Sequence, residues 1–414
     1  MNLTVVSLLV AVLIIARWIA ELWLARLNGR HVLAHADSVP EPFRGSFDGP
    51  AYAKAVQYTL AKIRFDRCAD THHVSILLLL LFSGLLPWMF EFFCSCVGES
   101  AWAMAAFLFT VAAALALTNL PLEWHEQFQL EQNFGFNTTT PKTWWLDRVK
   151  GFLLATVLGF PLLLLVLKFV DWTGNSWWLW AWGALLAFQL VIALLAPVLI
   201  LPLFNKFTPL PPGSLRDRLV SLAARTRFRA QSIQVMDGSK RSRHSNAFFT
   251  GFGRLRKIVL FDTLVEQLTE PELEAVLAHE IGHYRLRHIP KRLIASALAS
   301  LAGFGAISIL SRQEWFYRAF GFESGSIVPA LLLFGLLAGT ATFWFSPLAH
   351  WWSRRHEFQA DGFAAQVMND SQSLIGALRK LSEKNLSNLT PHPVYSAFYY
   401  SHPTLLERER ALTG

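Results

Sequence analysis

Seven long runs of apolar residues constrain this chain more than any other feature of its sequence. They cover roughly residues 3–27, 74–93, 101–120, 151–170, 176–202, 293–310 and 328–348. Each run is close to the length of about 20 residues that a helix needs to cross a bilayer. The run at 293–310 is the weakest of them because it is rich in Gly, Ala and Ser. The pattern predicts a mainly α, polytopic membrane protein with seven transmembrane helices.

Composition supports this assignment. Hydrophobic residues make up 53% of the 414 residues and charged residues only 16%, whereas a soluble domain has about 25% charged residues. The first apolar run lacks a basic segment before it, and it contains Arg17 and Glu21. We therefore expect it to stay in the protein as a membrane helix and not to be cleaved as a signal peptide.

The distribution of Lys and Arg between the runs predicts an orientation. Segments 28–73, 142–150 and 204–292 are basic, as is the tail after residue 350, whereas the connections after the second and fourth runs have almost no basic residues. By the positive-inside rule, the basic segments face the cytosol and the N-terminus lies outside. This topology accounts for the net charge of +8, so we expect no nucleic-acid partner.

The composition suits a bacterial inner membrane.

The stretch "AHEIGHYRLRH" predicts a metal site on a helix. Thr269 can cap this helix, Glu272 completes a capping box, and Pro290 should end or kink it. His279 and His283 are four residues apart and so share one helical face. The alternative is a surface helix with solvated histidines. Because catalytic zinc usually takes three protein ligands and leaves one position open, a further ligand must come from elsewhere.

The stretch "WWSRRHEFQADGFAAQ" offers that further ligand. Glu357 and Asp361 are again four residues apart. Glu357 can bind the metal, and Asp361 can accept the free ring N–H of a histidine ligand and fix its tautomer. The alternative is a solvated carboxylate pair beside Arg354 and Arg355. The upstream motif favours the metal site.

The segment before the histidine motif predicts a small α+β region. The stretch "SLRDRLVSLAARTRF" has a helical pattern, whereas "SIQVMDG", "NAFFTGFG" and "KIVLFDTL" are typical of strands. Residues 246–250 are a candidate edge strand to which a peptide can add by main-chain hydrogen bonds; an internal strand is the alternative. Residues 240–244 are interpreted as a solvated basic turn. We expect four parts: 1–203 and 293–348 in the membrane, and 204–292 and 349–414 in the cytosol.

Six stretches in order along the chain resemble one known family. They are "VPEPFRGSFDGPAYAKAVQYTLAKIRFD", "EQNFGFNTTTPKTWW", "SRHSNAFFTGFG", "LAHEIGHYRLRH", "SRRHEFQADGFA" and "SHPTLLERERAL". With them the chain resembles the type I CAAX prenyl proteases, which are integral-membrane zinc proteases. The resemblance implies seven helices that enclose a water-filled chamber, with a small α+β zinc protease domain on the cytosolic side.

The resemblance also implies roles for individual residues. The implied zinc ligands are His279, His283 and Glu357, with one zinc per chain, Glu280 as the catalytic base and Asp361 as the support of a ligand. Asn246 and Ala247 are expected beside the bound peptide. His402 is expected to stabilise the oxyanion, with Arg408 orienting it or binding a substrate carboxylate.

The predicted activity is zinc-dependent endopeptidase chemistry on a peptide or membrane-protein substrate, in which Glu280 takes the proton of the attacking water. An intramembrane protease is disfavoured because Glu272, Glu274, Arg285 and Arg287 flank the motif and charges at bilayer depth are costly. A transporter leaves the ordered motifs unexplained. A retired, metal-binding scaffold is disfavoured by the intact Glu280. The oligomeric state stays open.

Overall fold

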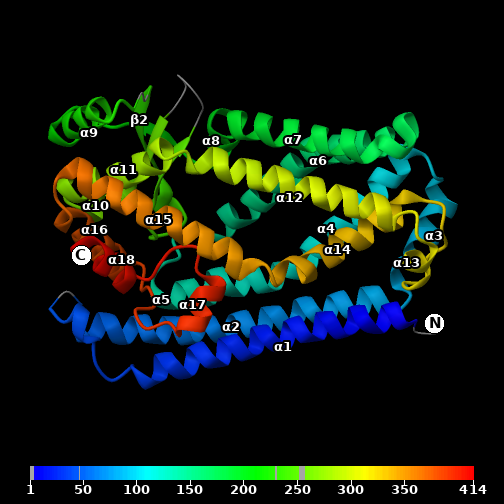
Figure 1. The fold of residues 1–414 in the computed structure, drawn as a ribbon, viewed down its shortest axis with the longest axis horizontal. Helices are drawn as coiled ribbons and strands as arrows, with labels where there is room; N and C mark the ends of the chain where they lie inside the picture. Colours follow the sequence, from blue (N-terminus) through cyan, green and yellow to red (C-terminus); the bar gives the residue numbers. More distant parts are fainter. Residues whose placement is uncertain (1–3, 46, 229–230, 251–256) are drawn as a thin grey trace.

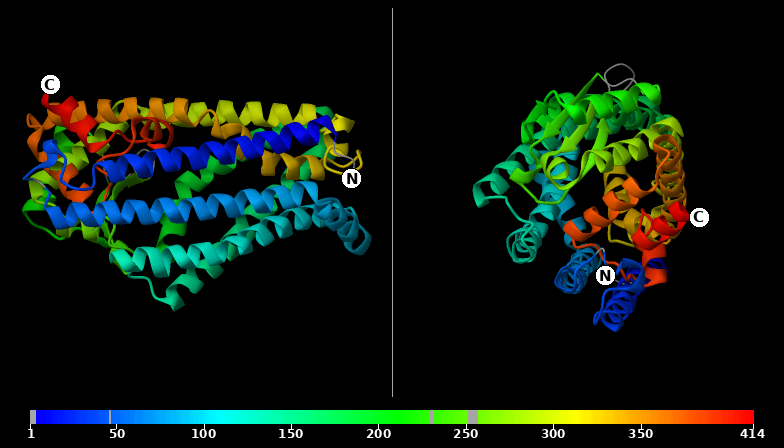
Figure 2. Two further views of the ribbon diagram at one scale, coloured as in Figure 1. Left: turned by 90° about the horizontal axis from the view of Figure 1, so that it is seen from below. Right: turned by 90° about the vertical axis from the view of Figure 1, so that its left-hand side faces the viewer.

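The computed structural model describes residues 4–45, 47–228, 231–250 and 257–414. Long helices run parallel to the long axis of the molecule, and a small sheet with short helices lies at one end (Figure 1). Helix α1 begins at one end of the molecule, and the C-terminus lies at the opposite end, which is also the end that holds the sheet (Figure 2). The mainly helical fold with a small α+β part is thus confirmed.

The first half of the chain is almost wholly helical. Side chains at the N-caps of its long helices accept hydrogen bonds from the first turn, for example Asp48 from the amide of Ala51 and Ser100 from the amide of Ala103. The long helix α1 lies beside α2 (Figure 1). The main helices are α1 (Val5–Ala34), α2 (Gly49–Phe82), α3 (Leu85–Val97), α4 (Ala101–His125), α6 (Pro141–Thr173) and α7 (Trp177–Leu195).

The second half has short helices near the sheet and long helices that run from the sheet end toward the opposite end of the molecule (Figure 1). Its helices are α9 (Ser214–Arg225), α10 (Asp262–Gln267), α11 (Glu270–Arg285), α12 (His288–Leu310), α13 (Glu314–Arg318), α14 (Ile327–Phe343), α15 (Ser346–Met368), α16 (Gln372–Lys384), α17 (Pro393–Tyr399) and α18 (Leu405–Thr413). Helix α11 buries Leu273, Leu277 and Ile281 in the same core as Ile258 and Leu260 of the sheet.

The described residues contain four helical segments that are long and apolar enough to cross a membrane, or up to six if each of two bent pairs counts as one span. Two predicted spans are thus bent: α2 and α3 meet at 60°, and α14 and α15 meet at 64°. The first bend has Gly84 in a left-handed conformation, and Pro347 lies in the first turn of the helix after the second bend. One long segment, Pro141–Phe204, contains α6 and α7 packed side by side. The count of seven stays a prediction.

The sheet has the strand order β1-β2-β4-β3. Strands β2 (Ser232–Met236) and β4 (Lys257–Phe261) are parallel, whereas β1 (Phe207–Pro209) and β3 (Ala247–Thr250) pair antiparallel with them. Each of the three predicted stretches contains a strand, but "KIVLFDTL" becomes helix α10 at Asp262, and residues 251–253 of "NAFFTGFG" lie outside the described residues. Strand β1 is too short to have been found by alternation. Among the described strands, β3 pairs with β4 alone, which agrees with the predicted edge strand, and the choice between an edge and an internal strand stays a prediction.

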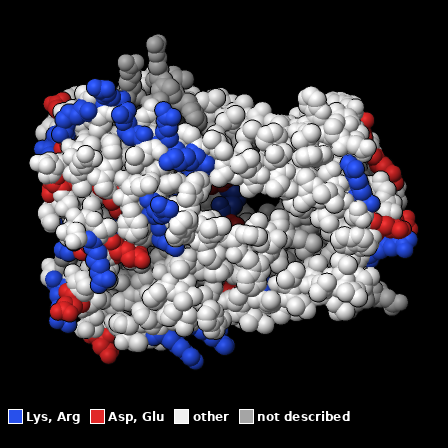
Figure 3. All heavy atoms as spheres, viewed as in Figure 1, with Lys and Arg blue, Asp and Glu red and all other residues white. Residues whose placement is uncertain are grey.

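Charged side chains are unevenly distributed over the surface. They gather over the sheet end and at the opposite tip, while the flank between them is almost free of charge (Figure 3). This flank is hollowed between α12 and α14, and charged side chains lie inside the hollow (Figure 3). An apolar flank between charged ends is the surface of a membrane-embedded protein.

Candidate metal centre

Helix α11 begins where its capping box predicts. The amide of Thr269 donates to Glu272 Oε2 at 2.8 Å, and Lys380 Nζ donates to the same oxygen at 2.8 Å. Burial raises the pKa of the Glu272 carboxyl, but these two donors outweigh it and hold that pKa below its usual value. The helix ends at Arg285, five residues before Pro290, because Arg287 adopts a left-handed conformation with φ of 58°.

Helices α11 and α15 approach closely at a glycine. A Cβ atom placed on Gly282 would lie 3.1 Å from the Cα atom of Ala360 and 3.2 Å from its carbonyl oxygen. Gly282 follows His279 by three residues, and Ala360 follows Glu357 by three. This contact therefore brings the two chemically active turns, 78 residues apart in the sequence, face to face.

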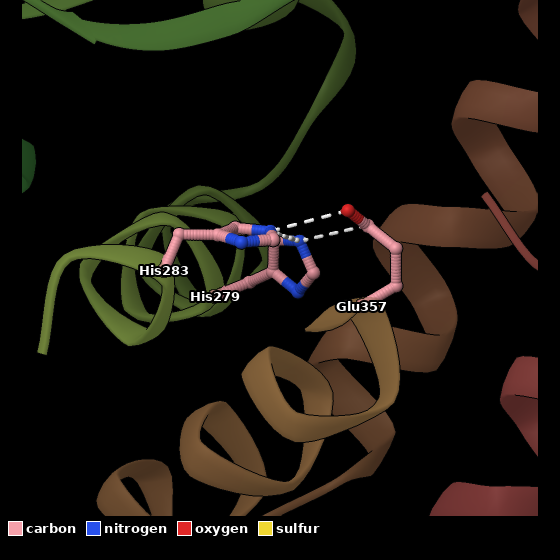
Figure 4. A group of neighbouring side chains, drawn as sticks. All are labelled: His279, His283 and Glu357. Atoms are coloured by element: carbon pink, nitrogen blue, oxygen red, sulfur yellow. Dashed lines mark hydrogen bonds and ion pairs between the residues drawn. The ribbon is translucent and has the colours of Figure 1, made fainter. Parts of the chain in front are cut away.

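The side chains of His279, His283 and Glu357 point toward one another from these two helices (Figure 4). The two histidine Nε2 atoms are 3.2 Å apart. Glu357 Oε2 lies 3.5 Å from His279 Nε2, and Glu357 Oε1 lies 3.3 Å from His283 Nε2. Tetrahedral ligands about 2.0–2.1 Å from a zinc ion are about 3.3 Å from one another. The donor set therefore fits zinc in both chemistry and spacing.

A buried ion pair holds the first histidine. Asp361 Oδ1 lies 2.8 Å from His279 Nδ1, and Arg408 Nε donates to Asp361 Oδ2 at 2.8 Å. Asp361 is 1% exposed and Arg408 is 9% exposed, so neither is a solvated surface charge. Arg408 binds Asp361 with two nitrogens. The structure thus places Arg408 behind the ligand and not against His402.

The loop between α17 and α18 brings His402 to the site. His402 Nδ1 lies 2.7 Å from Glu357 Oε2, although most of the ring is exposed. Arg354 on α15 supports this loop, because its Nη1 donates to carbonyl oxygens at the end of α17, to that of Tyr400 at 2.7 Å. A cavity of about 420 Å³ opens beside His402 and is lined by Asn388, Tyr399 and other residues of this loop region.

Glu280 follows the first histidine on the same helix. Burial raises the pKa of its carboxyl above the usual value, and the negative charge of Glu357 adds to this shift, whereas protonated His279 and His283 oppose it. A positively charged ion among the three donors would favour the carboxylate form in the same way as those histidines.

The predicted solvated turn at 240–244 is wrong for Arg241 and His244, whereas Lys240 and Arg243 are exposed as predicted. Arg241 forms a two-nitrogen ion pair with Asp147, and the ring of His244 stacks on Phe136 with centroids 4.0 Å apart. His244 Nε2 also lies 3.3 Å from Glu131 Oε2. The turn therefore joins the sheet to the segment before α6. The turn leads directly into β3. Asn246, the residue before this strand, is exposed, and its carbonyl oxygen accepts a hydrogen bond from the amide of Phe261.

Sequence reasoning also missed His288 and Gln359, which lie behind His283. His288 is 1% exposed, and its Nδ1 lies 3.0 Å from His283 Nδ1. The other ring nitrogen of His288 lies 2.9 Å from Gln359 Oε1. The one available signal was the third histidine in "HEIGHYRLRH".

The fold and the site together define a class of protein. A polytopic helical membrane protein with a largely buried His, His and Glu donor set, and with a carboxylate directly after the first histidine, is a membrane-embedded metallopeptidase. The comparisons with known proteins agree. Residues 28–206 match the CAAX prenyl protease N-terminal model, which has five membrane helices, and residues 209–414 match peptidase family M48.

Similar proteins cover almost the whole chain. CAAX prenyl protease 1 of Saccharomyces cerevisiae is 36% identical, with 90% of this chain and 88% of that protein covered. The homologue from Oryza sativa is 34% identical over 92% of each chain. The crystal structure of S. mikatae Ste24p is 34% identical and matches 100% of both chains with a TM-score of 0.91. The chain belongs to peptidase family M48, among the CAAX prenyl proteases. It is a multi-pass membrane metalloendopeptidase of a zinc-dependent family.

Proposed function

We propose that this protein cleaves extended peptide segments with one zinc ion held by His279, His283 and Glu357. The observation that carries the proposal is the convergence of three side chains from two separate helices: the two histidine Nε2 atoms are 3.2 Å apart, and the nearest Glu357 oxygens lie 3.5 Å and 3.3 Å from them. Two neutral imidazole lone pairs and a carboxylate turned toward one point repel each other unless a metal ion or a proton lies between them, and Glu357 and His279 are too buried for solvent to screen that repulsion. Their convergence therefore supports a metal site over a solvated cluster.

The neighbouring residues divide the remaining chemistry. Zinc supplies a Lewis acid that activates water and polarises a peptide carbonyl. Glu280 then takes the proton of the attacking water and passes it to the leaving amine. His402 donates an N–H to the developing oxyanion, and its exposed ring within 2.7 Å of Glu357 supports this role. Arg408 acts through Asp361, which orients His279, and does not touch the substrate.

The substrate is proposed to be an extended segment that adds to strand β3. Asn246 and Ala247 lie at its start, and among the described strands its second edge has no strand partner. Helix α11 packs against β3, so a peptide added there would run past the metal-binding turn. The cavity beside His402 has room for a substrate side chain. C-terminal CAAX segments, named for the relatives, are the first substrates to test.

We further propose that the site faces the cytosol. The segments that carry it, 204–292 and 349–414, are the basic ones that the positive-inside rule assigns to that side. A bacterial inner membrane stays a prediction from the sequence. A transporter and a retired scaffold are not favoured, because the metal-binding turns and Glu280 are intact.

Two variants test the division of roles. Glu280→Gln should keep one zinc per chain and lose peptide cleavage, because the carboxylate is a base and not a ligand. Glu357→Ala should lose zinc and cleavage together, because a donor is removed. Metal analysis after dialysis and cleavage of a fluorogenic peptide provide both readouts. Full zinc retention in Glu357→Ala, or parent activity in Glu280→Gln, would contradict the assignment.

A further inference from the structure

The two histidines of the metal centre are held differently at their outer nitrogens. His279 Nδ1 faces the carboxylate of Asp361, which can only accept a hydrogen bond, so His279 Nδ1 carries the proton. His283 Nδ1 instead faces another imidazole nitrogen, Nδ1 of His288, at 3.0 Å. One of these two nitrogens must donate and the other accept, so the contact alone leaves the tautomer of His283 open.

The far side of His288 resolves this choice. Its Nε2 lies 2.9 Å from the side-chain oxygen of Gln359, which can only accept. His288 Nε2 therefore carries the proton, and its Nδ1 is left with a lone pair. His283 Nδ1–H then donates to that lone pair, and His283 Nε2 is free to bind a cation. The reversed arrangement would protonate His283 Nε2 and block the metal.

The backbone is built to make this contact. Residues five apart on an uninterrupted helix point about 140° away from each other, so His283 and His288 could not meet on one. The helix breaks at Leu286, and Arg287 takes the left-handed conformation with φ of 58°. This turns His288 back toward His283. The ring of His356 stacks on the ring of His288, with centroids 4.0 Å apart, and so restricts its orientation.

We propose that His288 is a positioning residue for the metal centre, and that the relay from Gln359 through His288 to His283 selects the metal-binding tautomer of His283. The proposal rests on the zinc site of the proposed function. It predicts that the hydrogen bond, and not merely the packing of the ring, determines zinc affinity.

The test measures the zinc dissociation constant of the full-length protein in detergent by competition with a chelator. His288→Phe keeps a ring in the stack and removes the acceptor, and it should weaken zinc binding about 10–100-fold. His288→Asn places an amide oxygen near the position of Nδ1 and should recover most of that affinity. Equal affinities for His288→Phe and the parent would overturn the relay. Equal losses in His288→Phe and His288→Asn would also overturn it, because packing would then explain both.

If the protein does not fold after substitution of the buried His288, a second pair of variants at Gln359 tests the relay. Gln359 is exposed, so its replacement leaves the core intact. Gln359→Glu remains an acceptor and should bind zinc like the parent, whereas Gln359→Leu should bind more weakly. Equal affinities of these two variants would refute the relay. A parent protein that binds no zinc at all would instead refute the proposed function, so the two failures are distinguishable.

Discussion

Replacing Gly282 by alanine should separate the two helices that form the metal centre. The added Cβ atom would lie 3.1 Å from Ala360 Cα, 3.2 Å from Ala360 O and 3.2 Å from a ring carbon of Phe363. Carbon atoms in favourable contact are about 3.5–4.0 Å apart. The phenylalanine ring can rotate away, but the two backbone atoms move only with α15. We expect α15 to shift by about 0.3–0.8 Å relative to α11.

This shift should appear in zinc affinity. Zinc–ligand distances tolerate about 0.2 Å, so binding zinc must pull the separated helices together against the new methyl group. Overpacking of this kind costs about 1–3 kcal/mol, which corresponds to an increase of about 5- to 150-fold in the zinc dissociation constant. In the zinc-free protein the helices can relax, and alanine is a better helix former than glycine by about 1 kcal/mol. Thermal stability without zinc should therefore change little.

Gly362 provides the matched control. It lies on α15, is exposed, and a Cβ atom there meets nothing within 4 Å. Gly362→Ala should leave zinc affinity unchanged. The assay is chelator competition on both variants, with thermal unfolding of the zinc-free proteins to verify folding. If Gly282→Ala binds zinc as tightly as the parent, the close approach of α11 and α15 does not govern the site.

Three further outcomes follow from the fold. Arg408→Met removes the cationic partner of the buried Asp361 carboxylate, which then keeps only its contact with His279, and should lower the free energy of unfolding by about 3–5 kcal/mol; if chemical denaturation finds no loss, the ion pair is not what holds the site. Arg287→Gly relieves a left-handed residue and should stabilise the protein by up to about 1 kcal/mol, since the strain of about 1–2 kcal/mol exceeds the entropic cost of glycine; a lower unfolding midpoint would count against this. A reporter after Gly414 should read cytosol and one after Gly98 the opposite side, and a common side for both would refute the topology.

The sequence predicted those parts of the site that depend on short-range geometry. Helical spacing predicted that His279 shares a face with His283, and that Glu357 shares a face with Asp361. The capping box predicted the start of α11. The contact between α11 and α15 could not be predicted from local sequence, because nothing near Gly282 or Ala360 indicates that these two residues meet. The family resemblance supplied that link.

Other features escaped the sequence because each depends on a partner that is distant along the chain or on a break in a helix. The basic run at 240–244 was predicted to be solvated, but Arg241 forms an ion pair with Asp147, which lies almost a hundred residues earlier in the chain. The sequence assigned no role to His288, and only the left-handed Arg287 directs it to His283. Hydropathy found the apolar runs but not the 60° and 64° bends, because composition carries no direction.

The most direct test of the zinc assignment is a titration of the purified, chelator-treated protein with zinc. Bound metal and cleavage of an unfolded peptide are measured on the same samples. The proposed site predicts no cleavage without metal, and a rise in cleavage proportional to bound zinc that ends at one zinc per chain. Cleavage by the metal-free protein, or activity that rises only after a second zinc has bound, would contradict it.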